Sequence, residues 1–177
     1  MERLASARIG RTFNQYRDGP RAPLLRLRLV EYLEKHVHAR TLLVGEAPGY
    51  RGARVSGIPF TSERQLAGAG PAEATASILR LTLAELGMDD DVLLWNVVPT
   101  HPGTATSNRR PTRDEVAVGA VFAAELAHGR EVVAVGRVAH GALGGHYVRH
   151  PSHGGARAFR AGLLEFGGRG DHDADPS

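Results

Sequence analysis

The sequence predicts an α/β fold of three layers (α/β/α), in which helices cover both faces of a central four-stranded, mostly parallel sheet. Four short apolar runs have the length of buried strands, at 41–45, 92–96, 131–136 and, more weakly, 146–150. Segments with helical spacing of apolar residues separate these runs, and 177 residues suit one domain. Such alternation of strand and helix is typical of a parallel sheet that is buried on both faces.

The first 23 residues are expected to form a basic N-terminal arm rather than a packed element. Seven arginines lie within the first 28 residues, and Gly19, Pro20 and Pro23 interrupt the segment. A basic arm can follow a phosphate backbone, but an ordinary solvated segment fits the same composition.

The domain is expected to span 24–166. Its apolar residues recur at helical spacing in three segments, which predict helices over 24–38, 72–87 and 112–128. Thr112 and Glu115 have the spacing of a capping box, which is typical of the start of a helix.

Residues 167–177 form a polar, glycine-rich tail that is expected to be disordered. Its acidic and histidine residues resemble metal ligands in composition only, so we expect no metal there: Asp171, His172, Asp173 and Asp175. His146, His150 and His153 have no neighbouring carboxylates, so no metal is expected there either, and no cofactor is expected at all.

Composition excludes several kinds of site. Because the chain has no cysteine, it forms no disulfide, no thiolate zinc site and no cysteine-ligated iron–sulfur cluster. No apolar run approaches the roughly 18 residues of a membrane span, and the N-terminus lacks the apolar centre of a secretory signal. We therefore expect a cytoplasmic protein without membrane contacts.

The charge balance is compatible with a nucleic-acid partner. The formal net charge is +3, and Lys35 is the only lysine among the 22 basic residues. Arginine favours planar, bidentate contacts with phosphates and bases. A GC-rich genome would produce the same arginine-rich composition.

Polar side chains end or directly follow three of the four predicted strands: Glu46, Asn96 and His150. The carboxyl ends of parallel strands meet at one edge of a sheet, where ligands of α/β proteins bind. Taken singly, each residue also has a purely structural explanation, since Glu46 fits a plain turn and Asn96 could tie down a loop.

Two loops carry further candidate residues. Phe60 follows Pro59, which favours an extended path for the preceding residue, and its ring could either cap the core or stack on a base. The segment 99–111 contains three prolines together with Arg109 and Arg110, and irregular segments of this length are often functional.

Together these motifs resemble the uracil-DNA glycosylase superfamily. The resemblance covers roughly Thr41 to Gly162 and is strongest to the branch whose first motif is Gly-Glu-Ala-Pro-Gly. The matching pieces are GEAPG at 45–49, GIPF at 57–60, NVVPTHP with NRRPTRDEV within 96–116, and HPSHGG at 150–155. The iron–sulfur cluster of some relatives is excluded by the absence of cysteine.

The resemblance implies a DNA glycosylase that hydrolyses the N-glycosidic bond of uracil, or of a related deaminated base, and leaves an abasic site for base excision repair. Glu46 would handle the attacking water and stabilise the positive sugar, and His150 would donate a hydrogen bond to the uracil O2. Phe60 would stack on the extruded base, while Asn96 would pair with its N3–H and O4.

The resemblance also implies further contacts. Ala47, Gly49 and Tyr50 would contribute to base binding. The expected DNA contacts are Arg109, Arg110, Ser152, His153, Gly154 and Arg157.

The sequence departs from its relatives at two places. Gly49 stands where the best-known branch has a tyrosine that blocks the thymine methyl, so exclusion of 5-methylated bases is open. Gly154 and Gly155 stand where many relatives carry a bulky wedge that replaces the flipped nucleotide. We therefore expect a preference for single-stranded or mismatched DNA, because unstacking costs least there. We also expect the protein to be a monomer.

Two alternatives remain open at this stage. The chain could be a noncatalytic nucleic-acid-binding protein with the same fold, or it could hydrolyse free nucleosides or nucleotides. Oligonucleotide cleavage distinguishes the first, and equal turnover of monomer and oligonucleotide would favour the second.

Overall fold

The computed structural model describes residues 1–170 and confirms the predicted α/β fold. Its four strands are β1 (Thr41–Gly45), β2 (Val92–Asn96), β3 (Glu131–Val135) and β4 (His146–Val148). They form a wholly parallel sheet in the order β2-β1-β3-β4. Strands β1 and β2 are buried along their whole length, which explains their continuous apolar sequence.

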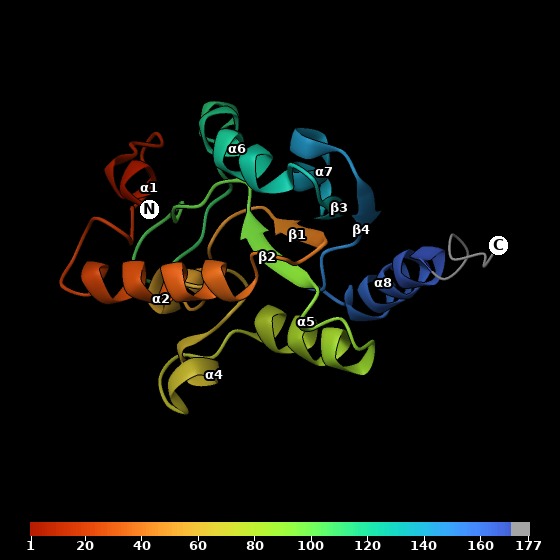
Figure 1. Cartoon of the computed structure of the whole chain (residues 1–177). Helices are drawn as coiled ribbons and strands as arrows, with labels where there is room; N and C mark the ends of the chain where they lie inside the picture. Colours follow the sequence, from red (N-terminus) through yellow and green to blue (C-terminus); the bar gives the residue numbers. More distant parts are fainter. Residues whose placement is uncertain (171–177) are drawn as a thin grey trace.

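Helices lie on both sides of the sheet (Figure 1). Helices α6 (Arg113–Ala127) and α7 (Arg137–Leu143) lie on one side, and α5 (Ala74–Glu85) and α8 (Ala156–Gly170) on the other. Helix α2 (Ala22–Lys35) runs beside β2, where the backbone N–H of Leu94 donates to the Tyr32 hydroxyl at 2.7 Å. Tyr32 thereby satisfies a backbone donor of this edge strand.

The three helices predicted from periodicity are present with slightly different bounds. The capping box of α6 is present as well, since the Glu115 N–H donates to the Thr112 hydroxyl and the Thr112 N–H donates to the Glu115 carboxylate. Three short helices were not predicted: α1 (Glu2–Ser6), α3 (Ala53–Ser56) and α4 (Glu63–Ala67). Helices α7 and α8 were not predicted either.

The expectation of an N-terminal arm over residues 1–23 is wrong, because this segment packs into the domain. Asn14, Gln15 and Tyr16 are each 1% exposed. Phe13 pairs with His101 as an antiparallel bridge, with two backbone hydrogen bonds of 2.9 Å. The Asn14 side chain supports the turn by donating to the carbonyls of residues 4, 5 and 7 and accepting from the Tyr16 N–H.

The expected tail is also partly structured. Helix α8 continues to Gly170, so residues 167–170 are helical instead of disordered. Its buried Phe159 and Leu163 anchor the helix against the core. Residues 171–177, which include the acidic residues of the tail, lie outside the described part of the chain.

Candidate active site

A pocket of about 750 Å³ opens at the carboxyl edge of the sheet. The chain passes from β1 to β2 on one side and later places β3 on the other side of β1. Such a reversal leaves a crevice outside the carboxyl ends of the strands, where α/β proteins bind ligands. Residues that end or follow all four strands line this pocket: Glu46, Asn96, Gly136 and His150.

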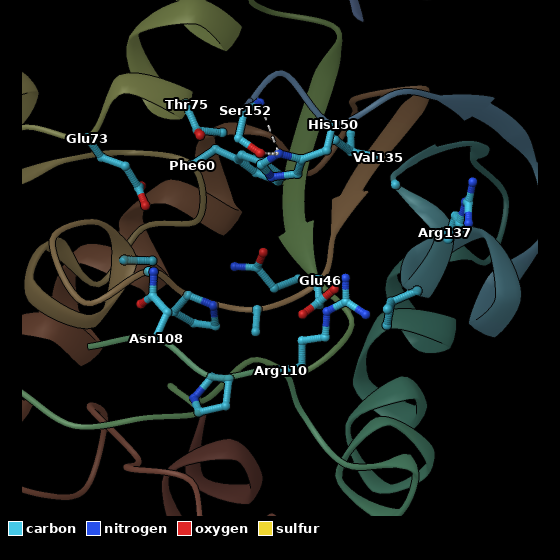
Figure 2. A pocket seen from close by; sticks show the side chains of 18 of the residues that line it. Glu46, Phe60, Glu73, Thr75, Asn108, Arg110, Val135, Arg137, His150 and Ser152 are labelled. Atoms are coloured by element: carbon cyan, nitrogen blue, oxygen red, sulfur yellow. Dashed lines mark hydrogen bonds between the residues drawn. The ribbon is translucent and has the colours of Figure 1, made fainter. Parts of the chain in front are cut away.

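Glu46 follows β1 and projects a carboxylate into the pocket (Figure 2). Its backbone is fixed because its carbonyl accepts a hydrogen bond from the Val98 N–H at 3.0 Å. Burial raises the pKa of the Glu46 carboxyl above its ordinary value, and the positive charge of Arg110 partly offsets this effect. Within residues 1–170 the carboxylate accepts no hydrogen bond, so its lone pairs are free for a ligand or a water.

Phe60 and Asn96 converge above Gly45, the last residue of β1. A Cβ at Gly45 would overlap the Phe60 ring and lie 3.2 Å from the Asn96 Oδ1, so glycine permits both side chains to approach the strand end. Phe60 adopts a φ of 51°, which non-glycine residues rarely do. Strain of this kind persists where the surroundings hold a functional residue in place.

The Asn96 side chain is the second free polar group of the pocket. Asn96 is 4% exposed, yet its amide makes no hydrogen bond to any residue that the structure describes. Its amide atoms are not among the enclosed polar atoms of residues 1–170 that lack a partner, so they reach the pocket that Asn96 lines. Both its oxygen and its nitrogen are therefore available to pair with a ligand.

His150 follows β4 and is held in one tautomer. The Ser152 N–H donates to its Nδ1 at 3.2 Å, and the Ser152 hydroxyl lies 2.8 Å from the same nitrogen. Because Nδ1 accepts, the neutral ring carries its proton on Nε2. Burial and the neighbouring His153 both lower the pKa of His150, which favours this neutral form.

The loop between β2 and α6 closes the lower side of the pocket. Fully buried His101 places its two ring nitrogens 2.8 Å from the carbonyl oxygens of Pro48 and Thr104, so it joins the Glu46 loop to this segment. The Asn108 side chain accepts a hydrogen bond from the Tyr50 N–H at 2.9 Å. The irregular segment 99–111 thus holds the loop that follows β1 and carries Glu46.

Most of the predicted site residues meet in this pocket. They are Glu46, Ala47, Gly49, Phe60, Asn96, Arg109, Arg110, His150, Ser152 and His153. Arg109 is held by two hydrogen bonds to the Glu115 carboxylate, of 2.6 and 2.7 Å. Tyr50, Gly154 and Arg157 are not among the lining residues.

Sequence reasoning missed several lining residues. They are Glu73, Thr75, Asn108, Arg137, Tyr147 and Arg149. Asn108 lies in the segment 99–111, which was predicted to be functional. Gly136 ends the predicted strand 131–136, for which no functional residue was predicted. Glu73 is the N-cap residue of α5 and Thr75 lies in the first turn of that helix, outside every motif, so only the folded chain brings them here.

The region expected to lack a wedge is open. A Cβ added at Gly154 would meet no atom within 4 Å, and the neighbouring His153 is exposed with a φ of 52°.

Residues 1–170 contain neither a metal-binding cluster nor a membrane span. No group of three or more histidine, cysteine, aspartate or glutamate residues there could hold a metal ion. No helix of this part of the chain is long and apolar enough to cross a membrane.

The protein is an α/β domain with a pocket at the carboxyl edge of a parallel sheet, lined by an aromatic ring, a free amide and a carboxylate. The model of the uracil DNA glycosylase superfamily matches residues 33–167, and the chain belongs to that superfamily.

Among solved structures, the chain is similar to wild-type SMUG2 from Pedobacter heparinus, with a TM-score of 0.65 and 12% sequence identity. The match covers 97% of this chain and 94% of that one. At this identity the likeness concerns the fold. A search of curated proteins gave no match.

Proposed function

We propose that the protein is a DNA glycosylase that hydrolyses the N-glycosidic bond of uracil, or of a related deaminated base, and leaves an abasic site for base excision repair. One observation carries the proposal: the free Glu46 carboxylate, the free Asn96 amide and the Nε2–H of His150 line the same pocket as the Phe60 ring. Membership of the superfamily supports it.

Glu46 serves the sugar side of the reaction. As the bond to the base breaks, positive charge develops on the sugar, and a nearby carboxylate stabilises it and orients the attacking water. The free lone pairs of the Glu46 carboxylate suit both tasks. The hydrogen bond from the Val98 N–H to the Glu46 carbonyl holds the backbone of this residue in place.

His150 serves the base side of the reaction. The departing uracil gathers negative charge on O2, and the Nε2–H of the neutral imidazole donates a hydrogen bond to that oxygen. One such donor, aimed where charge develops, typically contributes about 10²–10³ in rate. Ser152 contributes by holding Nδ1 as an acceptor.

Asn96 and Phe60 recognise the base. The Asn96 oxygen accepts from the uracil N3–H, and its nitrogen donates to O4, while the ring rests on Phe60. Cytosine presents the opposite donor and acceptor pattern at these two positions, so it would leave buried groups unpaired.

The preferred substrate is single-stranded or mismatched DNA. The open space at Gly154 supplies no side chain to fill a duplex after a base is extruded, so a base that is already unstacked costs least to bind. Arg110, Arg137 and Arg149 line the pocket and are available to phosphates.

The test is release of uracil from a labelled single-stranded oligonucleotide, with alkali revealing abasic sites. Glu46→Ala and His150→Ala should each lower the single-turnover rate by about 10² or more. Glu31→Gln, a change on the exposed face of α2 outside the pocket, is the matched control and should keep the wild-type rate. Wild-type rates in both pocket variants would overturn the proposal.

A noncatalytic nucleic-acid-binding protein is the second candidate, and the open space at Gly154 is the observation that favours it. It predicts salt-sensitive binding of oligonucleotides with no abasic product from any base. Hydrolysis of free nucleotides is the third, and equal turnover of deoxyuridine monophosphate and the oligonucleotide would favour it.

A further inference from the structure

The pocket contains a second carboxyl group, that of Glu73, which the proposed reaction does not use. Glu73 occupies the N-cap position of α5, where a carboxylate ordinarily accepts hydrogen bonds from the first turn of the helix. It makes no such bond. Its side chain points into the pocket from the side opposite Glu46 and Arg110 (Figure 2).

Two glycines of the first loop make room for this carboxyl. A Cβ at either Gly49 or Gly52 would overlap the carboxyl atoms of Glu73. The missing side chain at Gly49 therefore does not leave the pocket open on that side. The carboxyl of Glu73, brought in from a distant part of the chain, occupies the space.

The Glu73 carboxyl has no partner of its own. It forms no hydrogen bond or ion pair with any residue of the described chain. Burial alone raises the pKa of this carboxyl, with no cation to offset the effect. The residue is only partly buried, and its carboxyl oxygens reach the pocket, where water or a ligand can donate to them. In either protonation state the carboxyl keeps an oxygen that accepts a hydrogen bond.

The position of Glu73 relative to the other groups indicates which part of a base it faces. This step rests on the proposed function. In a pyrimidine the sugar is attached at N1 beside Glu46, O2 faces His150, and N3 with O4 faces Asn96. The remaining edge begins at C5, next to O4 and away from the sugar, and Glu73 enters the pocket across from Glu46 (Figure 2).

We infer that Glu73 is a specificity-determining residue, whose carboxyl accepts a hydrogen bond from an O–H or N–H donor carried by the substituent at the 5-position of a pyrimidine. Pyrimidines with a hydroxymethyl or amino substituent at that position are the favoured class. A methyl group there offers no donor and would desolvate the carboxyl without compensation. Unsubstituted uracil leaves room for water beside the carboxyl.

The experiment measures binding separately from catalysis. Single-stranded oligonucleotides carry one 2′-fluoro nucleotide with uracil, thymine or 5-hydroxymethyluracil, because the fluorine suppresses cleavage by disfavouring positive charge on the sugar. Fluorescence anisotropy gives the dissociation constant of each for the wild type, Glu73→Met, Glu73→Ala and Glu73→Gln. Glu31→Gln is the control for loss of one negative charge.

The wild type should bind the hydroxymethyl base about tenfold or more tightly than thymine, as expected for one hydrogen bond to a carboxyl group. This ratio should fall to about 1 in Glu73→Met, which matches the length of the side chain without its oxygens, and in Glu73→Ala. Glu73→Gln keeps a carbonyl oxygen and should keep part of the preference. Glu31→Gln should keep all of it.

A wild type without this preference, or a ratio unchanged in Glu73→Met and Glu73→Ala, would overturn the inference. A merely structural role of Glu73 would weaken binding of all three oligonucleotides equally, and so would also overturn it. The same oligonucleotides without fluorine test the proposed function separately. Absence of any base release would refute the glycosylase, while the binding ratios still decide the role of Glu73.

Discussion

Burial sets the protonation states of the two proposed catalytic residues in opposite ways. It raises the pKa of the Glu46 carboxyl and lowers the pKa of the His150 imidazole. The proposed reaction needs the carboxylate and works with the neutral imidazole, and both forms are present on the alkaline side of these values. Activity should therefore be lost toward acid.

A pH profile tests this expectation. The single-turnover rate of uracil release should fall as the pH falls, with a midpoint above the ordinary glutamate value of 4.5 because the Glu46 pKa is raised. Glu46→Gln should be slow and should lack this acid limb. A wild-type rate that stays constant down to the ordinary value of 4.5, or that rises toward acid, would contradict the assignment of Glu46.

Asn96 is the residue that we expect to discriminate uracil from cytosine. Asn96→Ala should lower the rate on uracil about tenfold to a hundredfold, because the N3–H and O4 of the base lose their partners. It should lower the discrimination between uracil and cytosine as well. Thr75→Ala, a change of similar size in the same pocket, is the control, and the rates on both bases should be compared in competition.

The site residues that could be predicted from the sequence lie at strand ends, whereas those that could not be predicted reach the pocket from other elements. Glu46, Asn96 and His150 end or closely follow strands, so the geometry of a parallel sheet brings them together once the strands are recognised. Glu73 reaches the pocket from the start of a helix, and its place depends on the room left by Gly49 and Gly52. Nothing local in its sequence signals that contact.

At the scale of elements, Glu115 joins three segments. It is 2% exposed, completes the capping box of α6, pairs with Arg109 and accepts a hydrogen bond from the Arg11 N–H at 3.0 Å. The hydrogen bonds from Arg109 are the main reason that the pKa of Glu115 is lowered to about 2. A carboxyl whose pKa is lower in the folded state stabilises the fold above its unfolded pKa and loses this effect as the pH falls.

Glu115→Gln should lower the free energy of unfolding by about 2–3 kcal/mol at neutral pH. The wild type should lose this difference as the pH falls from 4.5 toward 2, the interval between the ordinary and folded values. Urea unfolding over that range measures it. Glu85→Gln is the control, because its ion pair with Arg160 is half exposed and should contribute under about 1 kcal/mol. Equal effects of the two substitutions would contradict this role.

The N-terminal segment shows where patterns of composition mislead. Its arginines and its glycine and proline residues suggested a solvated arm, but the polar Asn14 and Gln15 are buried because they satisfy backbone groups. Arg17 and Arg21 meanwhile pair with Asp18 and Glu63. Sequence periodicity detects regularly spaced apolar residues, and the buried Leu4, Ile9 and Tyr16 of this segment do not recur at a helical or strand spacing.

Asn14→Ala should therefore destabilise the whole domain by about 1–3 kcal/mol, since the Ala5 carbonyl and the buried Tyr16 N–H lose their hydrogen-bond partner. Arg8→Ala, on the exposed side of the same segment, should change the free energy of unfolding by less than about 0.5 kcal/mol. Urea denaturation of both variants measures the difference. A free arm would make the two substitutions equally harmless.

For the whole molecule, the charge around the pocket matters most. Arg137 and Arg149 line the pocket with positive charge, and we expect DNA to bind on this side. Replacing Arg137 and Arg149 together by alanine should weaken binding to single-stranded DNA and lower the slope of log K against log salt by about 0.7 for each phosphate that the protein no longer neutralises. Arg40, at the amino end of β1 and paired with Asp91, is the control. An unchanged slope in the double variant would place the DNA elsewhere.

The strand order also determines how far apart Glu46 and His150 lie. Neighbouring strands lie about 4.8 Å apart, so the ends of β1 and β4, which carry Glu46 and His150, begin two intervals or about 10 Å apart. The strand between them, β3, is followed by Gly136, a residue with a φ of 86° and no side chain to obstruct that interval. A width of this order accommodates one flat ring with its sugar. The spacing between the strands thus sets the distance between Glu46 and His150 that is available to a single nucleotide.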